Sequence, residues 1–475
     1  MIIVSSASLR FLTHEGWSVD ISISRQLARF ALALEFDDLP KEVVREAKRY
    51  LYDTIGCAFG GFDTRDSQII RRLYRQMEGT HEASLLVSGE RIPAVNATLA
   101  NAIAVRALDF NDIYWREDPS HPSDLIPAAL SVGELAGATM QATLTAIVLG
   151  YEFEQRLCEF AKPGVRERKW HHATLTQFAA PLVAGKLLRL SEDQLVNAIG
   201  ISGSHSHTIG APTAGALTMT KNTVDPLAVQ AGVFAALMAQ EGFTGTEEIF
   251  EGKEGFMDVF GPDWDVPALV DNLGASFKIM ECSMKAFPTE ALTHTHIAAT
   301  LQAVTEHDIQ PEDIEEVRVT TIARARDILF DPAKYEPKSR ETADHSLPYC
   351  IARAILDRKI TIRSFDEEQL QDPRLKTIIH KIKGVASEEF EALFPEKQPS
   401  RVTIRMTSGQ EHSVYLEYPK GDPREPMTEQ DLDDKFAALT SARLSEQGQA
   451  RVKEAVFTSD TLAGVGHFMS MIVED

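Results

Sequence analysis

The richest group of chemically active residues lies in one segment, RALDFNDIYWREDPSHPSDLIPAALS, at residues 106–131. Asp109, Asp112 and His121 precede an apolar helix, and Ser123 stands where its side chain can cap that helix. Free N–H groups at a helix start suit a carboxylate ligand, so the segment predicts a site for an organic anion. The other interpretation is a capped helix beside a solvated acidic loop, but loops between buried helices often carry function.

A second segment, KWHHATLTQFAAPLVAGKLL at residues 169–188, begins an alanine-rich helix with two adjacent histidines, His171 and His172. The helix dipole at this end favours a neutral imidazole, which is the form that accepts a proton. A lone histidine is more often a satisfied core residue, whereas a pair at a helix start is rarer. The pair is therefore a candidate for proton transfer.

Two lysines stand alone among small or apolar residues. Lys221 lies in GALTMTKNTVDP, and Lys285 lies in ECSMKAFPTEALTHTHIAA. Such a lysine either runs along the surface with its ammonium group in water or is a cation reserved for an anionic substrate. A further segment, ETADHSLPYCIARAI, places His345 and Tyr349 at another helix start and makes them candidate substrate-binding residues.

Metal and cofactor chemistry is not predicted. The H-x-H pairs lie in helical or small-residue surroundings, where residues i and i+2 do not share a face. The four cysteines form no C-x-x-C pair, and no dinucleotide, P-loop, G-x-S-x-G or H-E-x-x-H motif is present. We therefore expect an enzyme that uses neither a metal ion nor an organic cofactor.

The overall composition is that of a globular protein with an acidic surface. The chain has 475 residues and a formal net charge of −22, a sign that repels phosphate backbones and anionic membranes. Nucleic-acid and membrane partners are therefore not expected. Sparse cysteine predicts a reducing cytoplasm. The first twenty residues lack the pattern of a signal peptide, and no apolar run is long enough to span a membrane.

The elements that must position these residues change along the chain. Apolar spacing is helical up to about residue 271, as in the segment 41–61. Beyond it, strand-like alternation appears at 315–322 and in a hairpin-like stretch at 401–418, with helices expected near 290–306, 343–357 and 373–383. Two helices, 428–438 and 443–456, end the chain.

We therefore predict a predominantly helical α+β protein. A large all-α domain is expected at residues 1–271, and a smaller α+β lid domain at residues 272–425. The C-terminal helices of residues 426–475 are expected to return to the helical domain.

Several segments, in order, resemble the MmgE/PrpD family: FDDLPKEVVREAKRYLYDTIGCAFGG, LDFNDIYW with SHPSD, LTMTKNTVDPLAVQAG, KAFPTEALTHTHIAA, ETADHSLPY and LEYPKGDPREPM. The resemblance covers nearly the whole chain after residue 25. It implies a helical domain with an α+β lid, a homodimer, and a site between the two domains. Carried over by position, that site consists of Asp109, His121, His171 or His172, Lys221 and Lys285.

The resemblance also implies a reaction, a cofactor-independent hydro-lyase acting on a small tricarboxylate. The LDFND and HPSD motifs are most similar to those of 2-methylcitrate dehydratases, which make 2-methylaconitate in propionate catabolism. Dehydration needs a base, an acid and cations for the carboxylates. We expect two histidines as the acid–base pair, Asp109 to orient one of them, and Lys221 and Lys285 to bind carboxylates. The other residues predicted to bind substrate are Asp112, Ser123, His345 and Tyr349.

Other functions stay open at this point. Within the family, the same pocket is compatible with a cis-aconitate decarboxylase or an iminodisuccinate-type epimerase, because each reaction begins at a carbon next to a carboxylate. From other classes, the alternatives are a metal-dependent hydrolase that uses the histidine pairs and a catalytically inactive helical scaffold.

Overall fold

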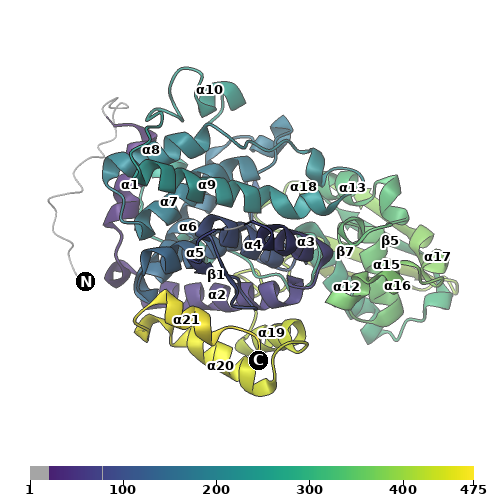
Figure 1. Cartoon of the computed structure of the whole chain (residues 1–475). Helices are drawn as coiled ribbons and strands as arrows, with labels where there is room; N and C mark the ends of the chain where they lie inside the picture. Colours follow the sequence, from purple (N-terminus) through teal and green to yellow (C-terminus); the bar gives the residue numbers. More distant parts are fainter. Residues whose placement is uncertain (1–20, 78) are drawn as a thin grey trace.

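The computed structural model describes residues 21–77 and 79–475. The segment 1–20, for which we expect no signal peptide, lies outside the described residues. Within the described ranges, no helix is both long and apolar enough to cross a membrane. The structure contains a large helical body and a smaller domain built on a four-stranded sheet (Figure 1). The predicted fold class, predominantly helical α+β, is confirmed.

The helical body is formed by the first half of the chain. Its long helices are α1 (Ile23–Ala33), α2 (Lys41–Gly61), α3 (Arg65–Arg75), α4 (Ala94–Arg106), α5 (Ile126–Ala136), α6 (Met140–Phe160), α7 (Ala173–Leu187), α8 (Glu192–Gly203) and α9 (Val224–Gln240). The short helices α10 (Phe256–Phe260) and α11 (Val266–Val270) follow. Short two-residue strands, β1 (Ala83–Ser84) with β2 (Arg91–Ile92) and β3 (Tyr114–Trp115) with β4 (Pro119–Ser120), punctuate the loops.

Small residues allow the central helices to approach closely. Helix α7 packs against α5, α6, α8 and α9, and nearly all of its residues are buried. A Cβ atom on Gly232 of α9 would lie 2.4 Å from the Cβ of Ala180 in α7, so only glycine fits at this contact. This close packing brings the N-terminal ends of α7 and α9 together, and both ends carry residues of the site described below.

The second domain contains the sheet, with strand order β6-β5-β7-β8. Its strands are β5 (Ile314–Thr321), β6 (Ile382–Ala386), β7 (Ser400–Met406) and β8 (Glu411–Leu416). The predicted hairpin is confirmed, since β7 and β8 pair antiparallel with Val402 opposite Val414. Its helices are α12 (His294–Glu306), α13 (Ala323–Leu329), α14 (Arg340–Ala343), α15 (Leu347–Asp357), α16 (Glu367–Leu370), α17 (Leu375–Ile378) and α18 (Glu388–Glu391). Helix α12 packs against α15, β7 and β8.

The helix expected near 373–383 is partly wrong. Leu375, Ile378, Ile379 and Ile382 have helical spacing, but the chain leaves the helical conformation at Lys381. From Ile382 it forms β6, which pairs parallel with β5. A five-residue strand gives too little alternation to override that spacing, and its partner lies more than sixty residues earlier in the chain.

The last three helices, α19 (Glu429–Thr440), α20 (Glu446–Phe457) and α21 (Val465–Met471), belong to the same apolar core as the first half of the chain. Helices α19 and α20 pack against α2, beneath which they lie in Figure 1. Phe436 stacks on Tyr52 of α2 at a ring distance of 4.1 Å. The chain therefore leaves the helical body, builds the second domain and comes back, although the domain boundaries given above stay predictions.

Candidate active site

Asp109 lies at the centre of a group of buried charges. It follows α4 directly and has a φ of 49°, a left-handed conformation that aspartate tolerates better than most residues. Its Oδ1 lies 2.6 Å from Nζ of Lys285 and 2.7 Å from Nη1 of Arg106, and its Oδ2 lies 3.0 Å from Nζ of Lys221. All four side chains are buried, so three cations share one carboxylate out of contact with bulk water.

These contacts make Asp109 a counter-ion. Burial alone raises the pKa of its carboxyl, but Lys221, Lys285 and Arg106 outweigh burial and hold the pKa well below its usual range. Asp109 therefore stays ionised and is unsuited to proton transfer. Asp109 keeps two lysines and an arginine together. Burial in turn lowers the pKa of Lys285, which Asp109 opposes.

The second domain contributes Asp344 and His345 to the same group. Nδ1 of His345 lies 2.6 Å from Oδ1 of Asp344, and its Nε2 lies 3.6 Å from Oδ2 of Asp109. Lys221 lies 3.7 Å from Asp344. Burial, reinforced by Lys221, lowers the pKa of His345 to about 4. The histidine that Asp109 faces is thus His345, so the structure brings three of the predicted residues, Lys221, Lys285 and His345, around Asp109.

His121 has one ring nitrogen free to act as a base. Its Nδ1 lies 2.7 Å from the backbone oxygen of Asp112, and because a carbonyl oxygen only accepts hydrogen bonds, Nδ1 must carry the proton. Nε2 of the neutral ring is then an unprotonated acceptor. Burial, together with the positive charges of Arg106 and Lys285, lowers the pKa of His121 well below its usual value. The neutral form therefore dominates at pH 7.

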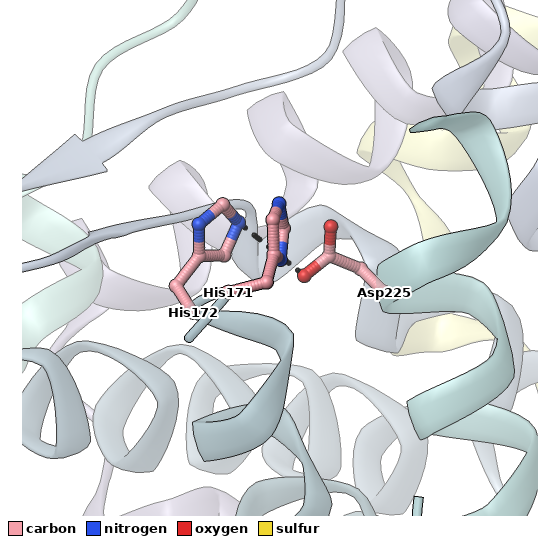
Figure 2. Close-up of side chains that lie close together, drawn as sticks. All are labelled: His171, His172 and Asp225. Atoms are coloured by element: carbon pink, nitrogen blue, oxygen red, sulfur yellow. Dashed lines mark ion pairs between the residues drawn. The ribbon is translucent and has the colours of Figure 1, made fainter. Parts of the chain in front are cut away.

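His171 and His172 lie beside His121, at the start of α7 as predicted from the sequence. The ring of His172 is 4.0 Å from that of His171 and 5.6 Å from that of His121. Nδ1 of His171 accepts a hydrogen bond from the backbone N–H of Ala173 at 3.1 Å, so its neutral form carries a proton on Nε2. That Nε2 has no partner among the described residues. Nε2 of His172 lies 3.4 Å from Oδ1 of Asp225 (Figure 2).

Three residues predicted to bind substrate have hydrogen-bond partners within the protein. Asp112 accepts hydrogen bonds from Ser123, through both its backbone N–H and its hydroxyl, and from the Tyr151 hydroxyl. Ser123 does not cap the following helix, which begins after Leu125 without a side-chain cap, so that expectation is wrong. The Tyr349 hydroxyl donates to the backbone oxygen of Ser364 at 2.6 Å inside the second domain. These hydrogen bonds support the loop and the second domain, and substrate binding by these side chains stays a prediction.

Sequence reasoning missed several charged members of the site. Arg106 was hidden in an otherwise apolar helix, although a single charge there, three residues before Asp109, is a usable signal. Asp225 follows Lys221 by one helical turn in the KNTVDP motif. Glu290 is half-buried, and burial, opposed by Lys285, raises the pKa of its carboxyl to about 7. No local pattern singles out Glu290.

Two groups of side chains have a composition that suits a metal ion. His171, His172 and Asp225 form one, and Asp109, Asp344 and His345 form the other, each with its ligand atoms within 4.8 Å of one another. The carboxylates of the second group already contact Lys221 and Lys285, which would repel a cation there. In the first group, Asp225 lies 3.8 Å from the guanidinium of Arg106. The expectation of metal-free chemistry therefore stays a prediction.

Comparison with known proteins places these residues in a family. The MmgE/PrpD N-terminal domain matches residues 25–268, and the MmgE/PrpD C-terminal domain matches residues 287–461. A cis-aconitate decarboxylase of Mus musculus is 26% identical over 446 residues, 89% of this chain and 88% of that protein. A 2-methylcitrate dehydratase of Escherichia coli (strain K12) is 24% identical over 463 residues, 88% of this chain and 90% of that protein. The two family domains together span most of the sequence, and the chain belongs to the MmgE/PrpD family.

Proposed function

We propose that this protein dehydrates 2-methylcitrate to 2-methylaconitate in propionate catabolism, with neither a metal ion nor an organic cofactor. Dehydratases and decarboxylases are both lyases, and the chain is an enzyme of this class. A tricarboxylate carries three negative charges, and the buried group of Arg106, Lys221 and Lys285 supplies three positive ones. In this acidic protein, the three buried cations that Asp109 holds together suit the carboxylates of such a substrate.

The reaction follows from the protonation states of the histidines. Nε2 of His121 takes the proton from the carbon next to a carboxylate, and the electron pair of that C–H bond forms the new double bond. The C–O bond at the adjacent carbon breaks, and an imidazole of the His171–His172 pair protonates the departing hydroxyl, which leaves as water. Lys221 and Lys285 stabilise the charge that builds up on the carboxylate.

The observation that carries this proposal is the packing of a free basic nitrogen beside imidazoles that can donate a proton. His121 has an unprotonated Nε2, and the ring centroids of His121 and His172 are 5.6 Å apart. Dehydration needs both a base and an acid, whereas a reaction that needs only one of them has no use for the pair.

Decarboxylation of cis-aconitate is a second candidate, favoured by the 26% identity to cis-aconitate decarboxylases of Mus musculus and Homo sapiens. In that reaction a C–C bond breaks, CO₂ leaves, and a proton is delivered to carbon. The reaction needs a proton donor and cations but no base to open it. A His121 variant that no longer dehydrates 2-methylcitrate but decarboxylates cis-aconitate at the wild-type rate would favour this alternative.

The test is incubation of the purified protein with 2-methylcitrate, citrate and cis-aconitate. Absorbance of the new conjugated double bond reports dehydration, and released CO₂ reports decarboxylation. The proposal expects the largest kcat/KM for 2-methylcitrate with no CO₂. Release of CO₂ from cis-aconitate without any dehydration would replace the first proposal by the second, and turnover of none of the three acids would refute both.

A homodimer in the cytoplasm is also proposed, as the family resemblance implies. An exposed apolar face on the helical body supports self-association, because α3 presents Ile69 and Leu73 and α9 presents Leu227 and Phe234. The side-chain amide of Gln230 in α9 donates to the Tyr74 hydroxyl of α3, so the two helices are neighbours. Light scattering of the wild type and of Phe234→Glu tests this, with a monomeric wild type as the contradicting result.

A further inference from the structure

Asp225 is a buried carboxylate that the reaction described above does not use. It lies in the first turn of α9, is 1% exposed, and has no hydrogen bond to either carboxylate oxygen among the described residues. Its nearest charged or ionisable contacts are Nε2 of His172, at 3.4 Å from Oδ1, and Nε of Arg106, at 3.8 Å from Oδ2. Figure 2 shows Asp225 at the start of α9, facing the two imidazoles at the start of α7.

Arg106 cannot be the main partner of Asp225. Its Nη1 is already bonded to Asp109 at 2.7 Å, and its Nε lies equally far, 3.8 Å, from Asp225 and from Asp124. A buried carboxylate is costly unless an opposite charge or a hydrogen bond compensates it. His172 is the group in closest reach of Asp225, and a protonated imidazole supplies both the charge and the N–H donor.

We propose that Asp225 is a positioning residue that holds His172 as the proton donor of the reaction, so that the Asp225–His172 pair protonates the leaving hydroxyl. This inference rests on the proposed function. It also selects between the adjacent histidines, because His171 is held through Nδ1 by the backbone of Ala173 and lacks this contact to Asp225.

The atoms of His172 suit this role. Nε2 of His172 is 3.4 Å from Oδ1 of Asp225, close enough for the imidazolium form to pair with the carboxylate, and Nδ1 has no partner among the described residues. Nδ1–H gives its proton to the departing hydroxyl as the C–O bond breaks, and the neutral ring that remains keeps Nε2–H on Asp225. The proton that His121 removed from carbon is released to solvent, and His172 is reprotonated from solvent, which closes the cycle.

The electrostatics of Asp225 agree with this assignment. Burial raises the pKa of its carboxyl, but His172, His171 and Arg106 outweigh burial and bring the pKa below its usual value. Asp225 is therefore ionised at the pH of turnover. Other titratable and charged groups also face Asp225 and His172. From the helical elements these are Arg106 of α4, Glu154 of α6, and Arg166 and His171 before α7. From the loop around β3 and β4 they are Asp118, His121 and Asp124. Of these, His121 is kept neutral by burial and by nearby cations, so it is not the proton donor.

The first test uses the wild-type protein. Histidine labelled with ¹³C and ¹⁵N is incorporated, the His172 signals are assigned by their loss in His172→Gln, and the rings are titrated without substrate. We expect His172 protonated and His121 neutral at pH 7. A neutral His172 at pH 7 would overturn the proposal. The titration needs no turnover, so its result is independent of whether 2-methylcitrate is the substrate.

The second test uses Asp225→Asn, which keeps the shape and removes the charge. We expect kcat to fall about 10²–10⁴-fold, as on loss of a general acid, with KM within about threefold of the wild type. The basic limb of the kcat profile should move to lower pH, together with the His172 titration. In a His172→Gln background, Asp225→Asn should have almost no further effect on kcat, because Asp225 acts through His172.

Glu152→Gln is the matched control, because Glu152 is also buried and its partner is not a residue of the site. Its Oε1 lies 2.6 Å from Nε of Arg156. It should lower the thermal midpoint and leave the pH profile unchanged. Equal fold-losses for Asp225→Asn in the wild-type and His172→Gln backgrounds, or an unmoved pH profile, would refute the positioning role. If the wild type turns over no tricarboxylate, the proposed function fails, and the titration of His172 still decides whether Asp225 holds its proton.

Discussion

Replacing Asp109 by asparagine removes the one carboxylate that three cations share. Its contacts of 2.6, 2.7 and 3.0 Å to Lys285, Arg106 and Lys221 are all buried. Removing one partner of a buried ion pair costs about 3–5 kcal/mol. We expect a loss of that size in the free energy of unfolding of Asp109→Asn. The lower part of the range applies if Lys285 releases its proton, because burial already lowers the pKa of Lys285 and Asp109 opposes this effect.

The pH dependence of this loss has a definite sign. The folded-state pKa of Asp109 lies below the unfolded value of about 3.9, so its stabilisation is fully present above that value. The stabilisation disappears as the pH falls through the lower folded-state pKa. The difference in thermal midpoint between the wild type and Asp109→Asn should therefore be constant near neutral pH and narrow below about pH 4.

A ligand makes the test specific to the site. Tricarballylate is a tricarboxylate without a hydroxyl group, so it binds without being dehydrated. In the wild type its carboxylates compete with Asp109 for Lys221 and Lys285, whereas in Asp109→Asn they take the vacated place. A ligand at about 100 times its Kd stabilises the folded state by about 2.7 kcal/mol. We expect tricarballylate to raise the thermal midpoint of Asp109→Asn more than that of the wild type.

Glu152→Gln serves as the control here too, because it breaks a buried ion pair whose cation, Arg156, is not part of the site. Differential scanning calorimetry of the three proteins, with and without tricarballylate, gives all the comparisons. The reasoning is refuted if Asp109→Asn is as stable as the wild type, or if tricarballylate stabilises it no more than it stabilises Glu152→Gln.

Three further predictions concern the roles of single groups and of the lid. Lys285→Ala should raise KM and lower kcat/KM, because it removes an ion pair made in both the ground state and the transition state. His121→Ala should instead lower kcat about 10²–10⁴-fold with little change in KM. Steady-state kinetics on folded variants separate the two effects, and a wild-type kcat in His121→Ala would remove His121 from the mechanism. Turnover should survive exhaustive chelation, because Asp109 and Asp344 of the second candidate group already contact lysines and the proposed reaction uses the histidines for proton transfer; activity lost on chelation and restored by one added metal would contradict this. Residues 272–425 should exchange backbone hydrogens more slowly with tricarballylate bound, because closure excludes water; identical protection with and without ligand would argue against a moving lid.

Local patterns were sufficient for much of the fold. Helix α2 spans Lys41–Gly61, the segment in which apolar spacing predicts a helix. Ser191 and Gln194 form a capping box at the start of α8. These features depend on residues within one or two helical turns, where side-chain spacing and capping chemistry act directly. Strand β6 was missed because its identity depends on β5, a partner distant in sequence.

The site shows the same limit in its polar residues. Lys221 and Lys285 could be singled out because a cation among apolar residues is costly and needs a reason. The resemblance to the family placed Asp109 in the same site but did not predict that it pairs with both lysines. The pairing of Asp225 with His172 could not be predicted, because it depends on how closely α7 and α9 pack at Gly232 and Ala180. The hydrogen bond between Ser123 and Asp112 likewise depends on the path of the loop, which no local pattern predicts.

The most direct measurement of the central claim is an NMR experiment in D₂O with chelator-treated enzyme and 2-methylcitrate. The account predicts that 2-methylaconitate accumulates and that unreacted 2-methylcitrate gains deuterium at the carbon from which His121 removes the proton, through the reverse reaction. Both signals should disappear in His121→Ala. The absence of product and of deuterium exchange in the wild type would contradict the account.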